Sequence, residues 1–78
     1  MMVQAGKIYV HFESRHIMIL EVTEVLTLTN VVKGNASIYQ NTHKKRRLDR
    51  VKRIKTWYND SFDLQVIEGM FKPWKGIL

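Results

Sequence analysis

The chain has 78 residues, enough for one small domain, and its 45% hydrophobic content is that of a folded protein rather than a disordered one. It contains no cysteine, which excludes disulfides and thiolate metal sites. No apolar run is long enough to cross a membrane, and the first residues, MMVQAGK, lack an apolar signal core, so a cytoplasmic protein is expected. Because so short a chain buries little surface by itself, a homodimer is a further expectation.

Residues 7–13 (KIYVHFE) predict a half-buried strand, because apolar and polar side chains alternate along them. Ile8, Val10 and Phe12 are expected on the buried side, and the residues between them on the solvent side. Ser14 and the arginine after it predict a short connection to the next apolar segment.

Residues 16–30 (HIMILEVTEVLTLTN) predict more strand structure, since they are rich in β-branched residues and contain neither Pro nor Gly. Glu24 interrupts the apolar row that begins at Met18, which predicts a bulge or bend between strands at about 16–23 and 25–30. The start of the segment is apolar on both sides. It is therefore expected at the centre of a sheet or in a subunit interface.

The remaining strand signals are weaker. Gly34 and Asn35 tolerate positive φ, so residues 31–35 are predicted to form a turn. A short strand is expected at 36–42 (ASIYQNT), and alternation at 62–67 predicts a last strand. The aromatic tail that follows, MFKPWKGIL, is expected either to dock on a partner or to fold back over the open end of the sheet.

The segment His43–Trp57 (HKKRRLDRVKRIKTW) concentrates the charge of the chain. It holds eight of the thirteen Lys and Arg residues and a single carboxylate, whereas the rest of the chain carries five cations and six carboxylates. Surfaces that only maintain solubility mix both signs, so this asymmetry predicts an anionic partner. Nucleic acid fits, because Lys and Arg gain affinity by displacing counterions from phosphates. The residues expected to bind it are Lys44, Lys45, Arg46, Arg47, Arg50, Lys52, Arg53, Lys55 and Trp57.

Two structures are compatible with this segment. Leu48, Val51, Ile54 and Tyr58 recur at i, i+3, i+6 and i+10, as they would on the apolar face of a helix over about 43–58 that packs on the sheet. The same spacing also suits a 3₁₀ turn that leads into a strand. Trp57 likewise has two interpretations: its ring either stacks on an unpaired base among the arginines or belongs to the core.

Patterns for catalysis and for metal binding are weak. The three histidines lack the local spacing and the carboxylate partners of a metal site. No glycine-rich phosphate loop is present, and no nucleophile motif surrounds the serines. We therefore expect neither an enzyme nor a bound cofactor or metal.

Residues 48–54 (LDRVKRI) follow the basic KKRR and a short strand that ends near Tyr39. Together they resemble the closing element of WYL-type regulatory domains, which are small Sm-like, SH3-like barrels of bacteria and their phages. The resemblance covers residues 36–55, and the aromatic W-Y-L strand of the family has no counterpart here except Tyr39. It implies a barrel in which Arg47 and Arg50 bind nucleic acid or nucleotide-like ligands.

The expected fold is mainly β: a small curled antiparallel sheet or SH3-like barrel of about four or five strands, in a single domain over residues 1–78. The alternative is an α+β fold in which a basic amphipathic helix over about 43–58 packs on the sheet. The expected function is non-enzymatic nucleic-acid binding or regulation through residues 44–55. The alternative is a small adaptor or inhibitor that docks its basic face on an acidic protein.

Overall fold

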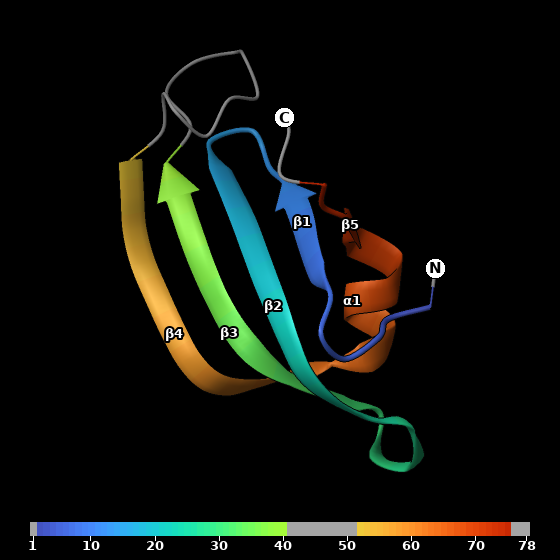
Figure 1. Ribbon diagram of the computed structural model, residues 1–78. Coiled ribbons are helices and arrows are strands. Elements are labelled where there is room, and N and C mark those ends of the chain that lie inside the picture. The colour runs from blue at the N-terminus through green and yellow to red at the C-terminus, as the bar shows by residue number, and fades with distance from the viewer. Residues whose placement is uncertain (1, 41–51, 76–78) are drawn as a thin grey trace.

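The computed structural model describes residues 2–40 and 52–75, apart from the side chains of residues 52–55. It contains one antiparallel sheet with the strand order β4-β3-β2-β1-β5 (Figure 1), which confirms the mainly β prediction. The strands are β1 (Ile8–Phe12), β2 (His16–Leu26), β3 (Val31–Gln40), β4 (Lys52–Asp63) and β5 (Lys72–Pro73). A short 3₁₀ helix, η1 (Thr27–Thr29), joins β2 to β3, and α1 (Leu64–Met70) follows β4.

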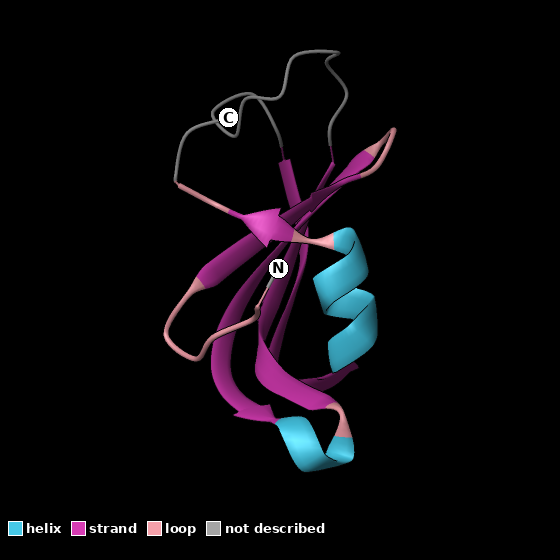
Figure 2. Cartoon of the chain, turned by 90° about the vertical axis from the view of Figure 1, so that its right-hand side faces the viewer, coloured by secondary structure: helices cyan, strands magenta, loops and turns pink. Residues whose placement is uncertain are grey.

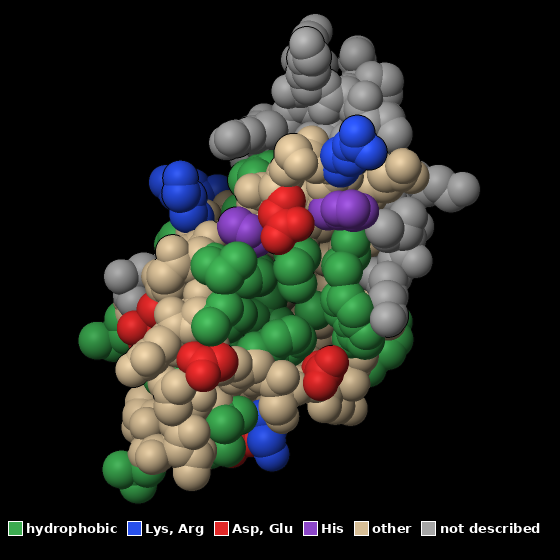
Figure 3. Space-filling view, turned by 180° about the vertical axis from the view of Figure 1, so that it is seen from behind, with side chains coloured by type: hydrophobic (Ala, Val, Ile, Leu, Met, Phe, Trp, Pro, Cys, Tyr) green, Lys and Arg blue, Asp and Glu red, His purple; other side chains and the backbone are tan. Residues whose placement is uncertain are grey.

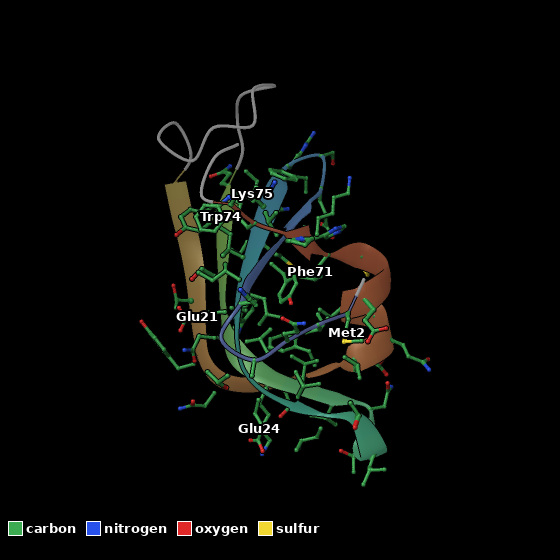
Figure 4. All side chains as sticks on the ribbon, turned by 45° about the vertical axis from the view of Figure 1, so that its right-hand side comes forward. Met2, Glu21, Glu24, Phe71, Trp74 and Lys75 are labelled. Atoms are coloured by element: carbon green, nitrogen blue, oxygen red, sulfur yellow. The ribbon has the colours of Figure 1, made fainter. Side chains whose placement is uncertain are left out.

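The sheet is curled, and α1 stands beside one of its faces (Figure 2). We call this the inner face and the opposite side the outer face. Figure 4 shows Phe71 between the sheet and α1, whereas Glu21 projects from the other side. Side chains of cross-strand partners lie on the same face. The main core is therefore built from the inner-face residues together with α1 and the flanking segments: Val3, Tyr9, Leu20, Val22, Val32, Ala36, Leu64, Ile67 and Phe71.

The two first strands follow the prediction in most respects. β1 ends at Phe12 and β2 begins at His16, so the short connection at Ser14 is confirmed. Glu24 lies at a shift of register between β2 and β3, which confirms the bulge. The strand does not divide there, however, because β2 continues through the bulge to Leu26.

The central position of β2 explains why both faces of its start are apolar. β2 has β1 on one side and β3 on the other, as predicted. Val10 and Ile17 are buried although they lie outside the main core. Tyr9, predicted on the solvent side of β1, is also buried, and its hydroxyl accepts a hydrogen bond from the Gln4 backbone N–H at 2.8 Å. The side of β1 assigned to the core was therefore wrong: Tyr9, opposite Leu20, lies on the inner face, whereas Ile8, Val10 and Phe12 lie on the outer face.

The predicted turn at residues 31–35 is wrong, because these residues belong to β3. The chain turns earlier, at η1, and Asn30 adopts the left-handed conformation there with φ 58°. Gly34 has a different role. A Cβ atom at this position would overlap the carbonyl oxygen of Glu21 and lie 3.1 Å from Leu20 Cδ1. Only glycine allows β2 and β3 to approach this closely.

The predicted helix over about 43–58 is wrong where the structure describes it, since residues 52–58 belong to strand β4; residues 43–51 lie outside the described part. The predicted last strand at 62–67 is also wrong, because α1 begins at Leu64. Asp63 starts this helix: its side chain accepts hydrogen bonds from the backbone N–H groups of Gln65 at 2.9 Å and Val66 at 3.1 Å.

As far as residue 75, the C-terminal tail folds back on the sheet, as one of the two expectations for it proposed. Phe71 is buried in the core, and β5 pairs with β1 through Lys72 and Pro73. The backbone N–H of Trp74 then donates to the carbonyl of Ile8 at 2.9 Å. Among the described residues, the structure contains no helix of the length and apolar character needed to cross a membrane.

Candidate nucleic-acid interface

The basic segment connects the ends of two neighbouring strands. β3 ends at Gln40 and its antiparallel partner β4 begins at Lys52. Five of the predicted contact residues fall in the connection between these ends and lie outside the described residues: Lys44, Lys45, Arg46, Arg47 and Arg50. The connection must leave and re-enter the sheet at one end of this strand pair. The two residues that flank it, Gln40 and Lys52, pair with each other in the ladder.

Three further predicted residues belong to the first part of β4. In the ladder, Lys52 lies opposite Gln40, Arg53 opposite Tyr39 and Lys55 opposite Ile38. The register shifts between Ile38 and Tyr39, so β4 has an additional residue at this point. The backbone positions of these cations are thus fixed by pairing with β3. The basic segment is in part a strand of the sheet, and only in part a connection.

Trp57 is a core residue rather than a surface residue. It lies opposite Ala36 in the ladder, and its half-buried side chain packs against the main core. The small side chain of Ala36 leaves room on the inner face for the large indole. This arrangement agrees with the core interpretation of Trp57. The sheet assigns the adjacent residue, Tyr58, to the outer face, where its side chain is 73% exposed.

Sequence reasoning did not select Tyr58 because it did not identify residues 52–63 as a continuous strand. The signal that identifies Tyr58 is its place next to a core tryptophan in a strand, because side chains of successive residues point to opposite faces. Once Trp57 faces inward, its neighbours face outward. In a helix the same residues would be distributed differently between the buried and exposed sides. The sequence alone did not decide between the helix and the strand.

The rest of the described surface carries a balanced distribution of charge. Outside His43–Trp57 the sequence holds five cations and six carboxylates. On the face shown in Figure 3, the described Lys and Arg side chains stand apart from one another among acidic, His and apolar side chains. Since the chain outside His43–Trp57 is nearly neutral, it offers little electrostatic attraction to an anionic polymer. The basic segment is the part of the chain that attracts one.

His11, one of the two histidines that the structure describes, has several local partners. His11 Nδ1 lies 2.9 Å from the carbonyl oxygen of Met70, and its Nε2 lies 3.4 Å from a carboxylate oxygen of Glu13. The ring also contacts Phe71, with the two ring centroids 5.5 Å apart. These contacts tie β1 to the segment after α1. Within residues 2–40 and 52–75, no group of three or more His, Asp or Glu side chains is placed to hold a metal ion.

A shallow pocket lies at the opposite edge of the sheet from β4. It is lined by residues of the N-terminal segment, β1 and the tail: Met2, Gln4, Lys7, Ile8, Tyr9, Pro73 and Trp74. Because β4 and β5 form the two edges of the sheet, this pocket does not adjoin the start of β4. It forms no part of the candidate interface.

No protein-family model matches the sequence, and no curated protein or solved structure is significantly similar to it. The resemblance to WYL-type domains therefore stays a prediction.

Proposed function

We propose that this protein is a non-enzymatic nucleic-acid-binding protein that contacts phosphates through residues 44–55. The observation that carries the proposal is the segregation of charge. Eight of thirteen cations lie between the end of β3 and Thr56, with one carboxylate among them. The charge of a nearly neutral chain is thus concentrated in one segment, which follows β3 in the sequence and includes the start of β4.

The chemistry of the segment favours a polyanion over a single anionic group. Each Lys or Arg that neutralises a phosphate releases a condensed counterion, so affinity grows with the number of contacts and falls steeply with salt. Eight cations within twelve residues supply such contacts without any pocket. Lys52, Arg53 and Lys55 are anchored in β4, which supports one end of the segment.

The proposal is tested by measuring affinity for duplex DNA at several salt concentrations, for the parent and for two charge variants. The first variant replaces Lys45, Arg46, Arg50 and Arg53 with Gln. Each phosphate contact contributes nearly one unit to the slope of log affinity against log salt. The slope should therefore flatten by about three to four units in this variant.

The second variant is a matched control that removes the same amount of charge from elsewhere. It replaces four exposed lysines outside the segment with Gln: Lys7, Lys33, Lys72 and Lys75. Its slope should equal that of the parent. Equal flattening in both variants would show that net charge, and not the segment, determines binding. An unchanged slope in the first variant would show that these four residues do not contact phosphates.

The second candidate function is docking on an acidic protein. It predicts weak nucleic-acid binding by the parent at about physiological salt. In that case the first variant would act mainly on the rate of association with the protein partner. Absence of nucleic-acid binding by the parent even at low salt would favour this candidate and overturn the proposal.

A further inference from the structure

We propose that the outer face of β3 and β4 is a base-stacking surface, with Tyr58 as its main stacking residue, and that the protein binds single-stranded nucleic acid in preference to duplex. This inference rests on the proposed function and specifies its ligand. Tyr58 lies on the same strand as Lys52, Arg53 and Lys55. Three basic residues and an exposed aromatic ring thus belong to one edge strand.

The exposure of Tyr58 distinguishes it from every other aromatic residue of the chain. All eight aromatic side chains are described, and the others are buried or half-buried. Tyr58 lies in the middle of a strand and is 73% exposed, so its ring contributes little buried apolar surface to the stability of the fold. A ring held in this way leaves its surface available to a ligand with a flat face.

The neighbours of Tyr58 on the outer face are small and polar. Thr56 and its ladder partner Ser37 lie next along the strands, with their hydroxyl oxygens 3.5 Å apart. Beyond them, the half-buried Tyr39 lies opposite Arg53. The surface therefore runs from an exposed tyrosine across two hydroxyl groups to a second tyrosine, whose backbone pairs with that of a basic residue. Bases stack on such aromatic rings whatever their sequence.

The backbone that carries Tyr58 is fixed by a bulge. The register shifts between Gly34 and Ala36, and Asn59 adopts the left-handed conformation with φ 55°. The backbone N–H of Asn59 donates to the side-chain oxygen of Asn35 at 2.9 Å, which locks the bulge to β3. Tyr58 is thereby presented on a defined support, so that less conformational freedom is lost on binding.

The distribution of charge on the outer face gives the ligand a direction. Glu21 lies opposite Asn35 in the ladder, so it is level with Tyr58 along the strands and on the far side of β3 from it. A phosphate chain is repelled by this carboxylate and attracted toward the start of β4. The strand of nucleic acid therefore runs from Tyr58 toward Arg53. In a duplex the bases are already stacked on one another, so only a single strand can use the rings.

The test compares a single-stranded oligothymidylate and a duplex of the same length, at one low salt concentration, by fluorescence anisotropy. Tyr58→Leu keeps an apolar side chain but removes the aromatic ring, whereas Tyr58→Phe keeps the ring. Leu28→Ala serves as a control, because Leu28 is fully exposed at the η1 turn. Thermal unfolding checks that all three variants remain folded.

The parent should bind the single strand more tightly than the duplex. Tyr58→Leu should weaken single-strand binding about tenfold and leave duplex binding unchanged, since loss of one stacked base has about this effect. Tyr58→Phe and Leu28→Ala should behave as the parent. Undiminished single-strand binding by Tyr58→Leu, or an equal loss for the duplex, overturns this inference but not the proposed function. Absence of any binding by the parent overturns both.

Discussion

Gly34 pairs with Val22 of β2, beside the bulge that follows Val22, and a Cβ atom there would overlap the backbone of Glu21. We predict that Gly34→Ala destabilises the protein by about 1–3 kcal/mol, because the added methyl group overlaps the backbone of Glu21 and cannot be avoided by a change of rotamer. Chemical unfolding in urea measures this difference.

Gly69 provides the matched control for this substitution. It lies in α1, and an added Cβ atom would meet no other atom within 4 Å. Gly69→Ala should therefore leave stability unchanged or raise it by about 0.5–1 kcal/mol, since alanine has the higher helix propensity. If both variants lost the same stability, close packing of β2 against β3 would not be the reason for Gly34.

Gly34, Trp57 and Tyr58 show how far the residue type at one position predicts its structural role before the fold is known. Gly34 was predicted to sit in a turn because glycine adopts positive φ, but the structure uses its missing side chain instead. Trp57 and Tyr58 exchange roles once residues 52–63 are recognised as a strand. Residue type alone did not determine either role, because both depend on the neighbouring strand.

At the scale of elements, α1 depends on the residue before it. Asp63 accepts two hydrogen bonds from the first turn. Asp63→Ala should lower the free energy of unfolding by about 1 kcal/mol, because these N–H groups lose their partner. Asp63→Asn should recover most of the loss, since its side-chain oxygen also caps helices well. Both substitutions remove the charge, but only Asp63→Ala also removes the capping oxygen. Urea unfolding of the parent and the two variants therefore separates loss of the cap from loss of the charge.

β1 and β2 were predictable because residues 7–13 alternate and residues 16–30 are rich in β-branched residues without Pro or Gly. The errors fall where the pattern is short. Phe62, Leu64 and Val66 alternate as in a strand, yet Leu64 and Ile67 are the buried pair, at helical spacing. Over six residues the two periods cannot be separated. The capping aspartate is the signal that could have identified the helix.

At the scale of the molecule, fold and charge are divided between different parts of the chain. The core is formed by the inner face of the sheet, α1 and the N-terminal segment, while the charge is concentrated between β3 and β4. Composition identifies the basic segment. It did not indicate which strands flank the segment, because the ends of β3 and β4 are brought together only by long-range pairing. The candidate surface of Tyr39, Ser37, Thr56 and Tyr58 follows from that pairing.

The most direct test of the account is a map of amide chemical shifts during titration with a short oligothymidylate, measured by two-dimensional NMR on the full chain. We predict that the largest changes in the described part occur in the last residues of β3 and in residues 52–58 of β4. The amides of α1, of η1 and of the pocket beside Trp74 should change little. Changes concentrated on α1 or around Trp74, with residues 52–58 unaffected, would contradict the account.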